Sequence, residues 1–221
     1  MKQLFVENYL EQLCHWPKEG KHILAHFDAD TIIVYQAYHQ EIAEYAVEHR
    51  AFGGFGGASF SYSRMSWIKP NFLWMMFRSG WATKPNQERI LALRISRHFF
   101  DSLLAQSVAS TFDQEKYVTI DEWQQALQKS NVRMQWDPDH NPSGNPISRR
   151  AIQLGLRREM LTRFGKRELK EVIDITSFVT EQREVLQGNK NMLLTVSERV
   201  YQPSDEAIRK QIGLDDWPAN V

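Results

Sequence analysis

The sequence predicts an α+β fold in which a central mixed β-sheet, continuous or split, is flanked by helices. Runs rich in β-branched and aromatic residues, typical of interior strands, alternate along the chain with segments that repeat apolar residues at helical spacing. No linker divides the 221 residues, a length that suffices for one full hydrophobic core. We therefore expect a single domain over 1–221, with 1–20 as an N-terminal packing arm and 188–221 as a C-terminal extension.

Charge and cysteine content exclude several classes of protein. Lys plus Arg equals Asp plus Glu at 27 each, so net charge gives no general affinity for nucleic acid, and any anion site must be local. The single cysteine, Cys14, excludes an internal disulfide, and the scattered histidines predict no metal site. Because no run approaches the roughly 20 apolar residues of a membrane span, we expect a cytoplasmic protein with no membrane partner.

The first predicted strand feeds a helix. Residues 31–38, TIIVYQAY, have the composition of an interior strand, and residues 39–49 carry apolar side chains at helical spacing. Residues 52–63, FGGFGGASFSYS, predict a Gly-rich loop that runs into a short strand. We interpret this segment as a flexible loop and not as a phosphate cradle, because it lacks both the phosphate-loop and the dinucleotide-binding spacing.

The densest group of tryptophans, other large apolar residues and cations lies at residues 64–84, RMSWIKPNFLWMMFRSGWATK. Pro70 suits the first turn of a helix and Gly80 suits its end, so we predict a helix over 70–79. A helix that is apolar all round must be mostly buried, and its cations should emerge at its ends beside a cleft.

Further strands and helices alternate to the end of the chain. Strands are predicted at 89–96, 132–136 and 172–179, and helices at 5–15, 97–108, 121–128, 149–164, 180–187 and 204–211. The helix at 149–164 would begin after Ser148, a good N-cap, and stop at Gly165. Residues 136–146, WDPDHNPSGNP, contain too many turn formers to be regular.

The segment 64–84 supplies candidate nucleotide ligands. Aromatic faces beside cations bind nucleobases while the cations hold phosphates, and the candidates for these roles are Arg64, Trp67, Lys69, Trp81 and Lys84. The alternative is that the tryptophans belong to the core, which we expect of Trp74.

Three donors of the predicted helix 149–164 supply a second candidate anion site. Arg150, Gln153 and Arg157 are spaced three and four apart and would share one helix face. Guanidinium groups present a planar fork to phosphate or pyrophosphate oxygens. The alternative is a solvated face paired with Glu159 and Glu168.

Polar residues near two strands are candidates for catalysis. Asp137 and Asp139 precede His140, and a carboxylate that orients an imidazole can perform acid–base chemistry; an Asp-Pro turn with an incidental histidine is the alternative. In the strand 31–38, Gln36 must find a hydrogen-bond partner if it is buried, either as a structural tie or as a site residue.

Tyrosines and a glutamate complete the candidate set. Tyr35 and Tyr38 are the tyrosines of the strand 31–38, and a ligand-facing pair of Gln36 with a tyrosine is one interpretation of that strand. Glu159, among arginines, either orients a ribose hydroxyl or forms a structural ion pair.

Five segments carry a resemblance to a known family: VYQAYHQEIAEYA at 34–46, the segment 64–84, ILALRIS, WDPDH, and RRAIQLGLRREML at 149–161. In this order they resemble a family catalogued as a domain of unknown function, number four-two-nine-one in that series, whose name implies no activity. The order of a strand with a polar pair, a helix, a Gly/Ser stretch and a late acidic residue is also similar to ADP-ribosyltransferases. That similarity implies NAD as the cofactor, with Gln36 and Glu159 at its ribose.

The leading hypothesis is an NAD- or nucleotide-using transferase. In it, Arg64, Lys69 and Arg150 hold phosphates, and Trp67 or Trp81 stacks on the base. One rival is a non-catalytic module that binds RNA or another single-stranded nucleic acid through the same groups. Another is a ligase or nucleotidyltransferase with Lys69 as its covalent lysine, although the Lys-x-Asp-Gly pattern is missing. The leading hypothesis requires Lys69 and Arg150 to border one hollow.

Overall fold

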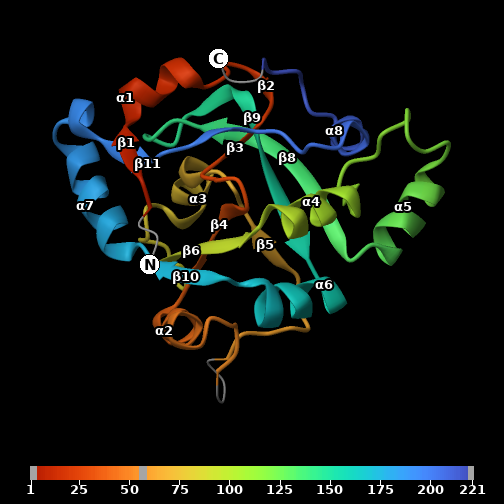
Figure 1. Cartoon of the computed structure of the whole chain (residues 1–221), viewed down its shortest axis with the longest axis horizontal. Coiled ribbons are helices and arrows are strands. Elements are labelled where there is room, and N and C mark those ends of the chain that lie inside the picture. The colour runs from red at the N-terminus through yellow and green to blue at the C-terminus, as the bar shows by residue number, and fades with distance from the viewer. Residues whose placement is uncertain (1–3, 55–58, 219–221) are drawn as a thin grey trace.

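The structure is a computed structural model that describes residues 4–54 and 59–218. Over these residues the chain forms one α+β domain, so the predicted fold class is confirmed (Figure 1). The predicted loop 52–63 lies partly outside the described residues, since 55–58 are not described. Within the described part of the chain, no helix has the length and apolar character needed to cross a membrane.

The larger sheet has five strands and positions most of the polar residues discussed below. Its strands follow the order β2-β9-β8-β7, and β5 pairs with β9 on the same edge as β2. Their bounds are β2 (Gly20–Lys21), β5 (Ser66–Ile68), β7 (Ser107–Ala109), β8 (Val132–His140) and β9 (Pro146–Leu156). The β8 and β9 strands are antiparallel, whereas β2–β9 and β7–β8 are parallel.

A three-stranded antiparallel sheet of order β10-β6-β4 lies beside it, formed by β4 (Thr31–Tyr38), β6 (Arg89–Ser96) and β10 (Glu171–Asp174). The free edge of β4 meets the residue that follows β5. Tyr35 N donates to Lys69 O at 2.7 Å and Lys69 N donates to Tyr35 O at 3.2 Å. The central sheet is therefore split into two parts that join at Lys69.

Two short ladders tie the N-terminal segment to the C-terminal one. One joins β1 (Val6–Asn8) to β11 (Leu194–Val196), and the other joins β3 (Ile23–Ala25) to β12 (Arg199–Tyr201). Each ladder pairs strands that are far apart in the sequence, so the segments 6–25 and 194–201 are both built into the domain.

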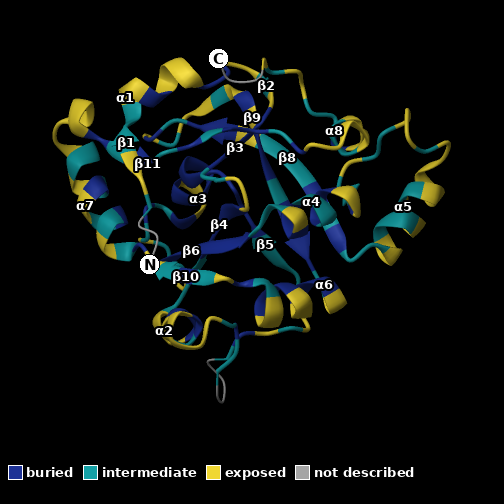
Figure 2. Cartoon of the chain, in the orientation of Figure 1, coloured by how far each residue is buried: buried dark blue, intermediate teal, exposed yellow. Residues whose placement is uncertain are grey.

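The helices surround the sheets, except for α3, which lies near the centre of Figure 1. Their bounds are α1 (Tyr9–Gln12), α2 (Gln40–His49), α3 (Phe72–Ser79), α4 (Arg97–Ala105), α5 (Ile120–Lys129), α6 (Arg158–Arg163), α7 (Thr176–Gln187) and α8 (Glu206–Ile212). Figure 2 shows α3 largely in dark blue and the outer faces of α2, α5 and α7 in yellow. The inner helix is thus buried and the outer ones are amphipathic.

The predicted central helix is confirmed, with a different start. The helix begins at Phe72 and not at Pro70, because Asn71 is its N-cap and the Asn71 side chain accepts a hydrogen bond from Trp74 N at 2.6 Å. Gly80 ends it in the left-handed conformation with a φ of 60°. Phe72, Leu73 and Met76 are at most 2% exposed, as expected for a helix that is apolar all round.

The helix predicted for 149–164 is wrong over most of its length. Residues Pro146–Leu156 form β9, and the α-helix is restricted to Arg158–Arg163. Ile152, Leu154 and Leu156 are buried at every second position, the period of a strand. Sheet neighbours on both edges of β9 outweigh the intrinsic helix propensity of this segment.

Other boundaries also differ from the prediction. The helix expected at 5–15 is replaced by β1 followed by α1, and the helix expected at 97–108 ends at Ala105 before β7. The segment 137–140, expected to be irregular, continues β8, and a bulge between Pro138 and His140 accommodates the turn formers. The strand expected at 172–179 ends at Asp174, because Asp174 Oδ1 accepts from Thr176 N at 2.9 Å and α7 begins there.

Candidate functional site

A row of polar side chains lies on one face of the larger sheet. Partners directly opposite in antiparallel strands project to the same side, and residues two apart in one strand do too. Arg133 is opposite Gly155, and Gln135 is opposite Gln153. Trp67 is also opposite Gly155, so Lys69, two residues further along, projects to the same side. We name this surface the Lys69 face; its residues are Trp67, Lys69, Arg133, Gln135, Asp137, Gln153 and Gly155.

Lys69 is the most unusual residue of this face. Its side chain is 5% exposed, yet among the described residues its ammonium group makes neither a hydrogen bond nor an ion pair. Burial lowers the pKa of Lys69 to about 7, helped by the nearby charge of Arg78 and opposed by that of Asp137. Near neutral pH a large fraction of this amine is therefore uncharged, and an uncharged amine is a nucleophile.

The carboxylate of Asp137 is held in place by two amides. Its Oδ1 accepts from Gln135 Nε2 at 2.7 Å, and its Oδ2 accepts from Gln153 Nε2 at 2.6 Å. These bonds fix the carboxylate on the Lys69 face, where its charge acts on Lys69. The Nε of Arg133 is buried on the same face without a hydrogen-bond partner in the described part of the chain.

Trp67 packs on a glycine in the neighbouring strand. A Cβ atom added to Gly155 would lie 3.0 Å from Cε2 and Cζ2 of the Trp67 indole and 2.7 Å from Sδ of Met65. The absence of a side chain at Gly155 therefore lets the indole approach the sheet. Trp67 is only partly buried, so it retains accessible aromatic surface beside Lys69.

Arg149 and Asp139 form a buried ion pair on the same side of the sheet as Lys69. The Nε and Nη2 atoms of Arg149 lie 2.7 and 2.6 Å from Oδ2 of Asp139, and Nη1 donates to Pro17 O at 2.7 Å. The guanidinium also stacks on Trp16, with its Cζ atom 5.3 Å from the ring centroid. This buried cation is fully paired, in contrast to Lys69.

Glu198 fixes the start of α3 two residues after Lys69-Pro70. Its Oε1 accepts from Phe72 N at 2.7 Å and its Oε2 accepts from Asn71 Nδ2 at 3.2 Å. Burial raises the pKa of Glu198 well above its ordinary value, and the charge of Asp139 adds to this effect. Gln12 Oε1 accepts from Glu198 N at 2.8 Å, so the N-terminal segment supports this contact.

The structure places some of the candidates from the strand 31–38 next to this site. Gln36 Nε2 donates to Ser66 Oγ at 2.7 Å and to Trp67 O at 3.2 Å, and the Tyr38 hydroxyl lies 2.9 Å from the same Oγ. Gln36 and Tyr38, both in β4, thus anchor β5 through hydrogen bonds to Ser66 and Trp67. Tyr35 is fully buried, and its hydroxyl has no hydrogen-bond partner in the described ranges.

The carboxylate–imidazole pair expected at His140 is not formed. Asp139 Oδ1 accepts from the backbone N of His140, at 2.7 Å, and Asp139 Oδ2 is bound to Arg149. The imidazole instead stacks on two aromatic side chains of α3. Its ring centroid lies 3.5 Å from that of Phe77 and 5.2 Å from that of Trp74. Burial lowers the pKa of His140, which favours the neutral ring.

The expected hollow between Lys69 and Arg150 does not exist, which corrects the sequence-based arrangement. Because residues 149–156 form a strand, Arg150 lies on the face of Ile152 and Leu154, whereas Gln153 lies on the opposite face with Lys69. A shared helix face with Arg157 is excluded for the same reason. The Arg157 guanidinium donates to the carbonyls of Leu127, Gln128 and Ser130.

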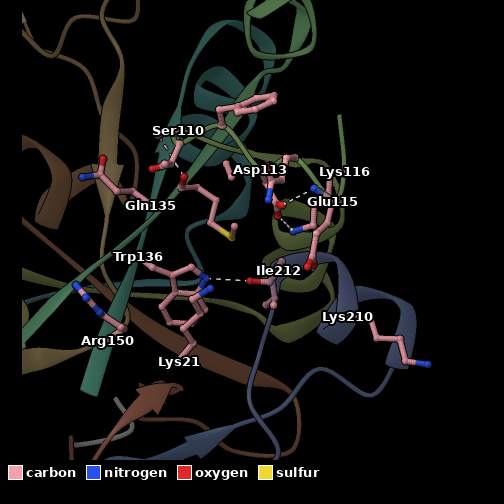
Figure 3. A pocket seen from close by; sticks show the side chains of 16 residues that line it. Lys21, Ser110, Asp113, Glu115, Lys116, Gln135, Trp136, Arg150, Lys210 and Ile212 are labelled. Atoms are coloured by element: carbon pink, nitrogen blue, oxygen red, sulfur yellow. Dashed lines mark hydrogen bonds and ion pairs between the residues drawn. The ribbon is translucent and has the colours of Figure 1, made fainter. Parts of the chain in front are cut away.

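Arg150 borders a separate cavity of about 780 Å³ on the other face of the sheet. Figure 3 shows Trp136 in this cavity, with Arg150 to one side and Lys116 beside Asp113 to the other. The indole donates to Ile212 O at 2.9 Å, and Lys116 lies 3.2 Å from Asp113. We name it the Trp136 cavity; its charged lining residues are Lys21, Asp113, Glu115, Lys116, Arg150 and Lys210.

The other candidates lie away from the Lys69 face. Trp81 is 8% exposed and its Nε1 donates to Pro142 O at 3.1 Å, as a core residue would. Lys84 Nζ lies 5.7 Å from the Phe77 ring centroid. Arg64 is exposed in the segment before β5, and Glu159 is exposed in the first turn of α6.

Sequence reasoning missed several residues of the site: Arg78, Arg133, Gln135, Arg149 and Glu198. For β8 a signal was present, since RMQWDPD at 133–139 places a polar residue at every second position. That alternation is typical of a strand with one polar face. Glu198 carries no local signal, because its partners Gln12 and Phe72 are distant in the sequence.

Comparison with known proteins assigns the chain to a family. No curated protein matches the sequence. The model of a protein family described as a domain of unknown function (DUF4291) matches residues 22–201. The matched range contains the whole Lys69 face together with Asp139, Arg149 and Glu198. Since the match covers most of the chain, the protein belongs to the DUF4291 family.

Proposed function

We propose that this protein is a nucleotide-using transferase whose reaction centre is the Lys69 face alone. The arrangement expected from the sequence, in which Arg150 holds phosphates beside Lys69, is abandoned because the two residues lie on opposite faces of the sheet. The observation that carries the proposal is the buried Lys69 amine, which lacks a partner among the described residues and has a pKa lowered to about 7. An amine tuned to neutral pH in this way is typical of a catalytic or ligand-binding group. A purely structural lysine at such depth would be paired, as Arg149 is.

The surroundings of Lys69 suit a nucleotide. Trp67 offers an aromatic surface for a base, and Arg133 and Arg78 offer guanidinium groups for phosphates. The charge of Arg78 acts on Lys69, so the two groups are close. NAD and nucleoside triphosphates share the base, ribose and diphosphate that such a surface would bind, and either is a candidate substrate.

A second candidate function is the binding of single-stranded nucleic acid in the Trp136 cavity. Four cations and one indole line this cavity, against the two carboxylates of Asp113 and Glu115. A base can stack on Trp136 while Lys21 and Arg150 contact the phosphate backbone. This activity would belong to the face opposite Lys69, so the two functions can be separated by substitution.

A thermal-shift panel of ATP, NAD and a short RNA tests both candidates. A ligand at 100 times its dissociation constant stabilises a protein by roughly 2.7 kcal/mol. We expect ATP or NAD to raise the melting temperature of the wild type and of Arg150→Ala, but not of Lys69→Met. The proposal fails if no nucleotide shifts the wild type, or if Lys69→Met responds fully.

The RNA arm of the panel addresses the second candidate. RNA binding in the Trp136 cavity would be lost in Arg150→Ala, kept in Lys69→Met, and weakened steeply by added salt, since bound phosphates release counterions. A shift with RNA in the absence of a shift with ATP or NAD would favour this second function over the first.

A further inference from the structure

We propose that Lys69 is a covalent nucleophile that accepts a nucleotidyl group from a nucleotide donor. The Nζ atom attacks the α-phosphorus, a P–N bond forms, and the phosphoanhydride P–O bond breaks. The leaving group is pyrophosphate from a nucleoside triphosphate, or nicotinamide mononucleotide from NAD. The proton lost by the amine passes to the carboxylate of Asp137 through an intervening water molecule, since the two groups are not in direct contact. This inference rests on the proposed function and specifies the chemistry of the same site.

The protonation state of Lys69 favours attack over simple phosphate binding. A lysine that holds phosphate by charge must stay protonated, and such an ammonium is best left hydrated. Lys69 is instead 5% exposed, has no carboxylate partner among the described residues, and lies near the positive charge of Arg78. Each of these conditions favours the neutral amine, which is the attacking form.

Other side chains close to Lys69 can fill the remaining roles. Arg133 and Arg78 offer guanidinium groups that can neutralise the phosphates and the leaving group. The two glutamine amides that hold Asp137 keep its carboxylate oriented on the Lys69 face, where its charge is felt by the amine. The site therefore separates the nucleophile, the charge-stabilising cations and the proton acceptor into different side chains.

The position of Lys69 in the fold also suits a fixed nucleophile. Its backbone is bonded to Tyr35 on both sides, N to O and O to N, at the junction of the two sheets. Two residues later Asn71 and Glu198 fix the start of α3. The side chain thus projects from backbone that is held by a strand on one side and a helix cap on the other.

Intact-protein mass spectrometry tests the inference directly. The full chain is incubated with Mg²⁺ and with each of ATP, GTP, CTP, UTP or NAD, in the absence of any acceptor. We expect a mass increase of one nucleoside monophosphate moiety, mapped to Lys69, that is released by acid and stable to alkali, as a phosphoramidate is. The small product distinguishes the donors, being pyrophosphate from a triphosphate and nicotinamide mononucleotide from NAD.

Variants and pH separate this inference from the proposed function. Lys69→Arg and Lys69→Met should form no adduct, whereas Lys129→Met, at an exposed lysine of α5, should react as the wild type does. The rate of adduct formation should rise with pH through about 7, following the pKa of Lys69. An adduct at another residue, or one that persists in Lys69→Arg, overturns the inference.

The experiments distinguish failure of the proposed function, nucleotide use at the Lys69 face, from failure of the further inference, covalent transfer to Lys69. If ATP or NAD raises the melting temperature through Lys69 but no donor forms an adduct, the proposed function stands and the covalent step is wrong. If no nucleotide binds and no adduct forms, both are wrong. A folded Lys69→Arg variant, checked by its circular dichroism spectrum, excludes misfolding as the cause of a lost adduct.

Discussion

At the scale of single residues, two buried cations on the same side of the sheet differ in how burial is compensated. Arg149 is 3% exposed and has a carboxylate, a carbonyl and an indole ring as partners. Lys69 is 5% exposed and has none of these among the described residues. Because an uncompensated buried charge is costly, the first arrangement is expected of a structural residue and the second of a functional one.

The lowered pKa of Lys69 predicts how stability depends on pH. The amine has an ordinary pKa of 10.5 and a folded-state pKa of about 7, so between these values the unfolded chain binds more protons than the folded one. The free energy of unfolding contributed by this group therefore rises with pH over that window. We expect the wild type to gain stability relative to Lys69→Met as pH increases from about 7 to 10.

Urea unfolding of both proteins at several pH values measures this difference. Using Lys69→Met as the reference cancels the titration of all other groups. A difference in stability that stays constant over this pH range would show that Lys69 is not perturbed in the folded protein.

The Asp139–Arg149 pair should be essential to stability. Removing one partner of a buried ion pair leaves the other charge uncompensated and typically costs about 3–5 kcal/mol. We therefore expect Asp139→Ala to lower the free energy of urea unfolding by this amount. Glu206→Ala, which removes one member of the exposed Lys210–Glu206 pair, is the control and should change little. Equal effects of the two substitutions would contradict the structural role of Asp139.

At the scale of elements, α3 and β5 position the site, and Glu198 joins them to the C-terminal segment. The helix predicted at 70–79 was correct apart from its start, because Gly80 is a strong local signal for its end. The start was misplaced because Pro70 was assigned to the first turn and the N-cap at Asn71 was not recognised. The strand β9 was missed because its arginines, leucines and glutamine are also good helix formers. Its strand conformation depends on neighbours that are remote in sequence, so the error moved Arg150 to the wrong side of the molecule.

Glu198 should stabilise α3 through its hydrogen bonds and not through its charge. We expect Glu198→Gln to keep an oxygen for Phe72 N and to fold normally. Glu198→Ala leaves Phe72 N and Asn71 Nδ2 without this partner and should cost about 1–3 kcal/mol by urea unfolding. If Glu198→Gln is as damaging as Glu198→Ala, α3 needs a carboxylate at this position and the prediction is wrong.

The raised pKa of Glu198 makes the free energy of unfolding depend on pH in the opposite direction to the contribution of Lys69. Above the ordinary pKa of 4.5 the folded protein binds more protons at this group than the unfolded chain. Its stabilising contribution is therefore complete below that value and is lost as pH rises. Relative to Glu198→Gln, the wild type should lose stability from about pH 5 upward, and a flat difference would disprove the shift.

At the scale of the whole molecule, one sheet separates two surfaces that the sequence suggested were one. Lys69, Trp67 and Gln153 share the Lys69 face, whereas Arg150 borders the Trp136 cavity (Figure 3). The sequence could indicate which residues are candidates for the site, because strand patterns and the Trp-Lys segment 64–84 are recognisable from neighbouring residues alone. Which side of the sheet each residue occupies could not, because it depends on the register of β9 against β8 and β5.

The N-terminal segment 6–12 should contribute to the site because it contacts the segment 194–198. Gln12 Oε1 accepts from Glu198 N, and β1 pairs with β11 just before Glu198. We expect deletion of residues 1–15 to lower the melting temperature and to weaken nucleotide binding. Unchanged binding in the truncated protein would show that the N-terminal segment does not support the start of α3.

Isothermal titration calorimetry of ATP and NAD against three proteins tests the central claim most directly. The claim predicts that one of these nucleotides binds the wild type and Arg150→Ala with equal affinity, and Lys69→Met at least tenfold more weakly, a loss of about 1.4 kcal/mol. Equal binding to the wild type and Lys69→Met, with a loss in Arg150→Ala, would contradict it and place the nucleotide in the Trp136 cavity.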